Sequence, residues 1–369
     1  GVFQYGDGSN TDGDGAASTI NATTPIVAAG MNASNGLYDF EDVNLVGDTS
    51  AFGGFNAFWV LDGATGVGSR LDPGSLAAAE LSAADTIVLL NNPAGGNDTI
   101  DATGSNGNDE LNLDAGQRLF SFRDTDIFTG SSSIPVNLLL FGVGGDLVNP
   151  FTGSGAPTLT TTGTYTLRLG DASEVDGIII SAPNFGIGAT SIAGYRIENS
   201  TITGTGNRAI DAGFTSGTQV LENLTIADPT ANVNAITFSN TSGTLVLTDI
   251  AISSIASSFL DGVRVENNAV NANETLDAMF VNVDVSNFTG NGVIFSLDQT
   301  DGGSISVTQS DFTSAAGGAT RATRLFLDAD WSGVLSSIAF SNNTLAGAFG
   351  DGIEVFTGSG ASGTITSAS

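Results

Sequence analysis

The stretch IENSTITGTGNRAID (residues 197–211) carries a pattern that recurs through the second half of the chain. In it, Asn199 stands three residues before the apolar Ile202, and a second apolar position, Ile210, follows eleven residues after Asn199. The same pattern begins in TSGTLVLTDIAIS (241–253), where Asp249 precedes Ile252. Repeats of roughly 20–50 residues indicate a solenoid, a propeller or an array of modules.

The first position of the repeat holds an Asn, an Asp or a Gln in each of seven copies. These residues are Asp176, Asn199, Asn223, Asp249, Asn282, Gln309 and Asn342, and they precede Ile179, Ile202, Ile226, Ile252, Val285, Phe312 and Leu345. Side-chain amides at a turn can bond to their counterparts above and below, which predicts a ladder that satisfies buried polar groups and fixes the register. The two Asp copies are weaker members, because a carboxylate only accepts. The alternative is that these residue types simply favour turns.

The second position of the repeat predicts β-strands. Its apolar residues stand two apart, as Val263 and Val265 do, so that they share one face of a strand while Arg264 points outward between them. The same outward position holds Asp211, Thr237 and Glu354 in other copies. The apolar runs are too short for helices. We therefore predict an all-β fold, a single-stranded right-handed parallel β-helix in which each strand pairs with its counterpart one turn away.

The segment before the repeat differs from the rest of the chain. The repeat covers residues 84–369, whereas residues 1–83 lack it and contain most of SLAAAELSAAD (75–85), which predicts a short helix. A solenoid needs an atypical unit over the end of its core, so we predict that residues 1–83 form an N-terminal cap or small β subdomain. SGASGTITSAS (359–369) matches the start of another turn, which predicts a β-helix open at its C-terminal end, to be continued by further chain or another subunit.

Composition limits the possible partners. The net charge is −30, and the nine basic residues are all Arg. So acidic a surface disfavours nucleic acid and anionic lipid and favours cations such as calcium. The chain has no Cys, which excludes disulfides and thiolate metal sites. No run of 18 apolar residues occurs, so no membrane span is expected.

Catalysis finds little support in the sequence. Elimination on acidic sugars needs a proton-abstracting base and cations to neutralise the uronate, and the chain offers only scattered Arg. Hydrolysis of a glycosidic bond needs two paired carboxylates, and the sequence does not pair the candidates Asp211, Glu222, Asp261 and Glu266. The absence of His excludes the usual nucleophilic triads. We expect no enzyme and no catalytic residue.

Calcium is the one cofactor that local motifs suggest. NTDGDG (10–15) resembles the start of an oxygen-ligand loop, although Asn21 stands where a complete EF-hand has its bidentate Glu. GSNGNDELN (104–112) matches the calcium-binding nonapeptide except at Ser105, and AGGNDTI (94–100) is a poorer relative. The candidate ligands are Asn10, Asp12, Asp14, Asp98, Asn108 and Asp109. The alternative is that these segments are only turns rich in Gly and Asn.

Three segments together resemble a known class of repeat. GTYTLRLGDASEVDGIIIS (163–181), IENSTITGTGNRAID (197–211) and TSGTLVLTDIAIS (241–253), followed by DGVRVEN (261–267), are similar to the pectin-lyase-like parallel β-helix repeats of large bacterial cell-surface and secreted adhesins, including autotransporter-type passengers. The resemblance covers residues 84–369 and implies an extracellular, adhesive or structural role, and it carries over no catalytic residue.

We therefore expect a non-catalytic stalk, adhesin or filament subunit at a bacterial cell surface. Its expected partners are a second copy of itself, assembled end to end or laterally, further chain of the same protein, or cell-surface carbohydrate. Two alternatives stay open: a carbohydrate-active or carbohydrate-binding β-helix, including a phage-spike type, and a surface-layer lattice protein.

Overall fold

The computed structural model describes the chain in segments. These are the backbone of four short strands within residues 2–47, and residues 57–66, 74–82, 84, 86–90, 99–102, 109–121, 157–229, 233–254, 259–267, 275–298, 302–315 and 317–369. The chain divides into two compact units. The first unit is Gly1–Asp101 with Gln117–Thr158, and the second is Ala102–Gly116 with Leu159–Ser369.

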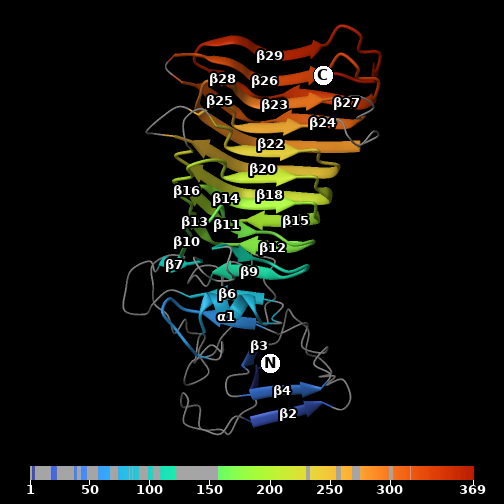
Figure 1. Ribbon diagram of the computed structural model, residues 1–369. Coiled ribbons are helices and arrows are strands. Elements are labelled where there is room, and N and C mark those ends of the chain that lie inside the picture. The colour runs from blue at the N-terminus through green and yellow to red at the C-terminus, as the bar shows by residue number, and fades with distance from the viewer. Residues whose placement is uncertain are drawn as a thin grey trace. The chain divides into compact units, whose positions relative to one another are not determined.

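The described residues of the first unit form short parallel strand pairs and one helix (Figure 1). Strand β1 (Val2–Gln4) pairs with β3 (Leu37–Asp39), β2 (Ser18–Ala22) with β4 (Val43–Gly47), and β6 (Thr86–Leu89) with both β5 (Ala57–Val60) and β9 (Arg118–Ser121); β7 is Thr99–Asp101. Helix α1 (Leu76–Glu80) confirms the short helix expected in SLAAAELSAAD, and the side chain of Ser75 caps it by accepting a hydrogen bond from the Ala78 amide. Parallel pairing is therefore already present upstream of residue 84.

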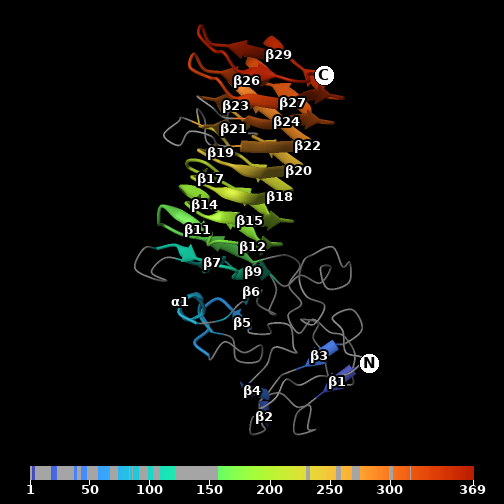
Figure 2. The same cartoon turned by 90° about the vertical axis from the view of Figure 1, so that its right-hand side faces the viewer.

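The second unit is a parallel β-helix, as the repeat predicts. One of its sheets has nine parallel strands, each paired with its counterpart in the next turn (Figure 2). In chain order these strands are β8 (Leu111–Asn112), β11 (Tyr165–Arg168), β14 (Phe185–Thr190), β17 (Ile210–Gly213), β19 (Ile236–Ser239), β21 (Val263–Glu266), β23 (Asn291–Leu297), β26 (Ala319–Leu327) and β29 (Phe349–Thr357).

The remaining strands of the second unit stack in the same order along the other side of each turn. They are β10 (Thr158–Thr160), β12 (Ser173–Asp176), β13 (Ile179–Ser181), β15 (Ala193–Glu198), β16 (Thr201–Thr203), β18 (Ser216–Ala227), β20 (Gly243–Ser253), β22 (Thr275–Phe288), β24 (Gly302–Thr308), β25 (Asp311–Ser314), β27 (Val334–Ser341), β28 (Thr344–Ala346) and β30 (Thr364–Ile365). Strand β30 pairs with β27, so SGASGTITSAS does begin another turn. Among the described residues, no helix is long and apolar enough to cross a membrane.

The core is built from columns of apolar side chains that repeat from turn to turn. Ile187, Ile210, Ile236, Val263 and Val293 occupy equivalent positions in the nine-stranded sheet and are fully buried, and the column continues through the buried Thr323. Each buried side chain of this size contributes about 1.5–3 kcal/mol. The equivalent residue of β29, Ile353, is 43% exposed.

The repeated Asn, Asp and Gln residues turn the chain between two strand segments. Their φ angles lie between 48° and 58° in Asn199, Asn223, Asp249, Asn282, Gln309 and Asn342. This left-handed conformation costs most L-residues about 1–2 kcal/mol, and Asn and Asp tolerate it best after Gly. One left-handed residue is enough for the corner: the pairing of β18 with β20 skips only Asn223 and Asp249. The main role of the repeated Asn, Asp or Gln is therefore to adopt the left-handed backbone conformation at the corner.

Side-chain bonds join some of these corners but not all. The amide of Asn199 donates to Asp176 (2.8 Å), that of Asn223 to Asn199 (2.7 Å) and that of Asn282 to Asp249 (2.6 Å). The equivalent bond between the next two corners would need Asp249 to donate to Asn223. A carboxylate has no donor, so this bond does not form. Five of the six corner side chains are exposed, so the ladder does not serve buried polar groups as the sequence suggested.

The most upstream copy differs in register from the sequence pattern by one residue. Asp176 pairs with Glu198, and Gly177, with a φ of 69°, takes the corner position equivalent to Asn199. The apolar partner is accordingly Ile180, which pairs with Ile202, and not Ile179. A Gly adopts the left-handed conformation without a side-chain penalty, so the corner needed no carboxamide here.

The corner conformation predicts an ordered pair of effects at Asn223. We expect Asn223→Ala to be about 1 kcal/mol less stable than Asn223→Gly, because both lose the bond to Asn199 but only Ala is strained at positive φ. Urea unfolding followed by circular dichroism measures both. Equal stability of the two variants would show that the side-chain bond alone matters.

Candidate functional site: an arginine-lined pocket on the nine-stranded sheet

The outer face of the nine-stranded sheet carries a column of side chains that face away from the core. Thr237, Arg264, Ile294, Arg324 and Glu354 follow one another in register across β19, β21, β23, β26 and β29. Asp211 precedes Thr237 in the same column, so the four residues that the sequence placed at the outward position do share one column, in which Thr237 is fully buried. Ile294 lies between two long Arg side chains, and its short side chain leaves space above it.

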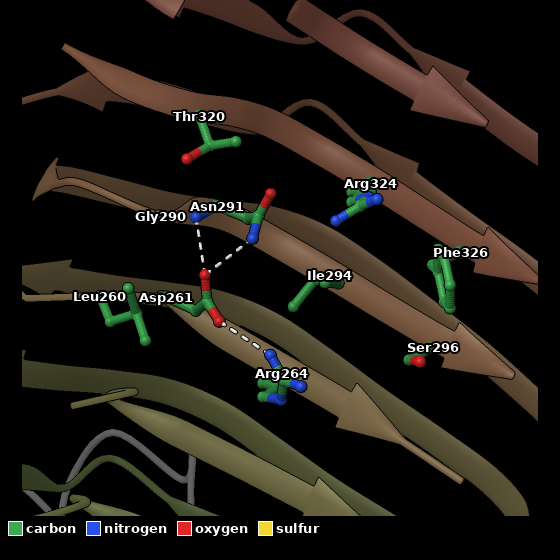
Figure 3. Close-up of a pocket in the computed structure, with 10 residues that line it drawn as sticks. All are labelled: Leu260, Asp261, Arg264, Gly290, Asn291, Ile294, Ser296, Thr320, Arg324 and Phe326. Atoms are coloured by element: carbon green, nitrogen blue, oxygen red, sulfur yellow. Dashed lines mark hydrogen bonds and ion pairs between the residues drawn. The ribbon is translucent and has the colours of Figure 1, made fainter. Parts of the chain in front are cut away.

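A pocket of about 390 Å³ occupies this space (Figure 3). Arg264, Ile294, Ser296, Arg324 and Phe326 line it from the sheet. The wall is completed by residues near the starts of the same three strands: Leu260, Asp261, Gly290, Asn291 and Thr320. Cations, apolar surface and hydrogen-bonding groups therefore meet in one concave site, as ligand pockets require.

Asp261 is the anchor of the pocket wall. It is only 2% exposed, and its Oδ1 accepts hydrogen bonds from the backbone amide of Asn291 (2.7 Å) and from the Asn291 side-chain amide (2.8 Å). Its other oxygen accepts from Arg264 Nη1 at 3.3 Å. Gly290 makes this approach possible, because a Cβ at that position would collide with Asp261 Oδ1. Asp261 thus ties two successive turns together and orients Asn291.

The bonds to Asp261 leave one polar atom without a partner. The carbonyl oxygen of the Asn291 side chain, Oδ1, is buried and accepts no hydrogen bond from any described residue. Figure 3 shows it directed away from Asp261, on the side where Thr320 and Arg324 lie. An unmatched buried acceptor costs about 1–3 kcal/mol, so the geometry favours an added donor at this point.

Arg264 is held in its charged form. Its Nε donates to Glu266 (2.6 Å), and its Nη1 contacts Asp261. Burial alone would lower the pKa of Arg264, but the hydrogen bond and charge of Glu266, with the charge of Asp261, outweigh burial and raise it. The guanidinium therefore presents a permanent positive charge to the pocket.

Arg324, on the opposite side of Ile294, is paired less completely. Its Nε lies 2.8 Å from Glu354 Oε2, and Arg321 Nε lies 2.5 Å from the same oxygen, but neither is aligned for a hydrogen bond there. Two guanidiniums thus share one carboxylate, although Arg321 also donates to Glu354 Oε1 at 3.0 Å. The Arg324 guanidinium lies 5.1 Å from the centre of the Phe326 ring, which stacks on Phe356. The planar cation is fixed by an aromatic surface while its outer nitrogens make no described bond.

The carboxylates considered for hydrolysis are engaged in ion pairs instead. Asp211 binds Arg208 at 2.5 Å, and Glu222 lies 3.5 Å from Arg196. Asp261 and Glu266 are brought together, but on the two sides of Arg264. This arrangement holds the Arg264 cation on the surface between two carboxylates.

A second polar cluster lies on the same sheet around Tyr165. Its hydroxyl donates to Asp211 (2.7 Å) across Gly188, which has no side chain in the way. The Arg168 guanidinium lies 4.3 Å from the ring centre. Burial, followed by the hydrogen bond to Asp211, raises the pKa of Tyr165 to about 12. A phenol held so firmly in its neutral form acts as a donor that positions Asp211.

The predicted calcium ligands fall mostly outside the described residues. Asn10, Asp12, Asp14, Asp98 and Asn108 lie there, and only Asp109, a turn residue with a φ of 56°, is described. Calcium binding at these motifs stays a prediction.

Another acidic group escaped the sequence analysis. Carboxylate oxygens of Asp298, Asp328 and Asp330 lie within 4.8 Å of one another. Asp298 and Asp328 directly follow Leu297 and Leu327, which pair in adjacent strands, so aligning the residues after the second apolar position could have found them. The grouping alone assigns no metal. Trp331, close by, is buried and 2% exposed, so its ring cannot serve as a sugar platform.

The fold and the pocket define the class of protein to which the chain can be assigned: a parallel β-helix with a ligand-sized site on one outer face. Scans against protein-family models, curated proteins and solved structures found no match.

The central position of Asp261 predicts a large loss on its removal. Asp261→Ala should destabilise the protein by about 3 kcal/mol, because Arg264 and both donors of Asn291 lose a buried acceptor. Asp261→Asn keeps one acceptor oxygen and should reduce the free energy of unfolding by less. Glu222 is exposed, so Glu222→Ala should reduce it only slightly. Urea unfolding measures the free energy of unfolding of the three variants. A loss of stability in Asp261→Ala no larger than in Glu222→Ala would contradict the role of Asp261 as the anchor of the pocket wall.

The raised pKa of Tyr165 predicts a loss of stability at high pH. The unfolded tyrosine ionises near pH 10 and the folded one near 12, so its contribution is complete below about pH 10 and is lost as the pH rises to about 12. We expect Tyr165→Phe to reduce this loss and Asp211→Asn to lower the Tyr165 pKa. Tyrosinate absorbance and urea unfolding across that range measure both effects, and an unchanged pH profile in Tyr165→Phe would refute them.

Proposed function

We propose that this chain is a non-catalytic structural and adhesive β-helix of a bacterial cell surface. The observation that supports this most is the bonding between successive turns. Besides the backbone pairs, side chains link neighbouring turns: Thr215 bonds to Thr241 (2.9 Å), and the side-chain amide of Asn267 donates to the Thr241 carbonyl (3.2 Å). Bonds directed along the stack suit an element that keeps its length under load and holds a binding face at a distance.

The distribution of Arg residues agrees with this proposal. Each of the six Arg residues of the second unit lies within 4.0 Å of a carboxylate of the same unit. A cation that already has a carboxylate partner is less available to neutralise an acidic polysaccharide during elimination. The likeness of the repeats to bacterial surface adhesins supports the extracellular location, and assembly of the chain with itself stays a prediction.

Carbohydrate binding is the second candidate, and the pocket favours it over carbohydrate cleavage. Phe326 and Ile294 offer apolar surface beside polar groups, a combination that sugars also use. The surface-layer alternative has no specific observation in its favour.

The proposal predicts binding without turnover. The full chain should bind intact bacterial or host cells in flow cytometry, yet release neither reducing ends nor unsaturated products from a panel of acidic and neutral polysaccharides. Turnover that Asp211→Asn or Glu266→Gln abolishes would overturn the non-catalytic assignment. These two variants separate a true activity from a contaminating enzyme, because each removes one candidate carboxylate.

A further inference from the structure

We propose that the pocket over Ile294 captures the C-terminal carboxylate of a peptide whose last residue is apolar. The inference names the ligand of the adhesive function proposed above and rests on it. Three independent features of the pocket match the three groups of such a residue: its carboxylate, its backbone N–H and its side chain.

The carboxylate is matched by the two Arg residues that flank Ile294. Arg264 and Arg324 stand on strands one turn to either side of it, and strands lie about 4.8 Å apart, so both guanidiniums can reach an anion placed over Ile294. Arg324 makes a single ion pair among the described residues, through Nε, which leaves its two outer nitrogens for a carboxylate. Paired N–H groups of Arg match the two oxygens of a carboxylate.

The backbone N–H is matched by Asn291. Its Oδ1 is the buried acceptor without a partner, in a residue only 8% exposed, and it points to the side of the pocket that holds Arg324. In a peptide the last N–H lies next to the carboxylate, so one residue can satisfy both sites. Thr320 lies on the same side of the pocket, and its exposed side chain is held only by a long bond of 3.4 Å from its hydroxyl to the Thr289 carbonyl.

The apolar side chain is matched by the floor and one wall. Ile294, Leu260 and the Phe326 ring supply carbon surface, and the volume of about 390 Å³ suits one residue and no extended segment. Strands β21, β23 and β26 are paired on both sides, so they leave no free sheet edge for a longer peptide to join.

Charge favours a ligand with a single negative group. The charged residues that line the pocket are two Arg, Arg264 and Arg324, and one carboxylate, Asp261, within a chain of net charge −30. A monoanion is tolerated at such a point, whereas a polyanionic glycan would be repelled by the surrounding surface. For this reason the peptide terminus fits better than an acidic polysaccharide.

Calorimetric titration of the full chain tests the proposal. The probes are N-acetyl-glycyl-seryl-leucine as free acid and as C-terminal amide, with D-glucuronate and D-glucose as the sugar pair. We expect the free acid to bind about tenfold or more tightly than the amide, and more tightly than either sugar. Equal affinity of acid and amide, or tighter binding of glucuronate, would overturn the peptide assignment.

Two variants and one control locate the binding. Arg324→Met keeps the side-chain stem on Phe326 but removes the charge, and should weaken the free acid about tenfold or more. Ile294→Glu places a carboxylate between the two Arg residues and should abolish binding while the thermal midpoint is retained. Arg168→Met, on the same sheet but outside the pocket, should bind as the unaltered chain does. Unchanged binding in both pocket variants would refute the site, whereas polysaccharide turnover would instead refute the non-catalytic function.

Discussion

In-register pairing between successive turns is the constraint on which the rest of the second unit depends. Because each strand bonds to its counterpart one turn away, every residue lies directly above a residue of the same structural position. A position can then hold only side chains that tolerate each other at about 4.8 Å. Apolar residues meet this condition in the core, as Ile210 under Ile236 shows. Among charged residues, Ile294 separates Arg264 from Arg324, whereas the stacked Glu198 and Glu222 share the neighbouring Arg196 as their counter-charge.

The fold was predictable because its signal is local and repeated. Each turn repeats the same sequence pattern. A wrong assignment in one copy, such as Asp176 where Gly177 forms the corner, therefore leaves the predicted register of the other copies unchanged. The role of the corner residues was harder to predict, because a hydrogen-bonding side chain and a left-handed backbone favour the same residue types. Sequence alone cannot separate these causes, whereas φ angles do.

The pocket could not be predicted from the same pattern. The pocket lies where the outward column departs from the pattern. Ile294 is shorter than Arg264 and Arg324, with which it pairs, and the space above it forms the pocket. Its polar wall comes from the residues before the strands, where DGVRV (261–265) aligns with NGVIF (291–295). That alignment places Asp261 beneath Asn291 and could have suggested their bond. It could not show that one oxygen of Asn291 is left without a partner.

The left-handed corners have a further consequence for how such chains are interpreted. A corner Asn is followed by one residue and then by the first residue of the next strand segment, where Thr is favoured. Asn199, Asn223 and Asn342 accordingly begin the triplets NST, NLT and NNT. These have the form of glycan acceptor sites, yet here the triplet follows from backbone geometry, and the Asn223 nitrogen is already bonded to Asn199. At these three corners the triplet therefore carries no information about sugar attachment.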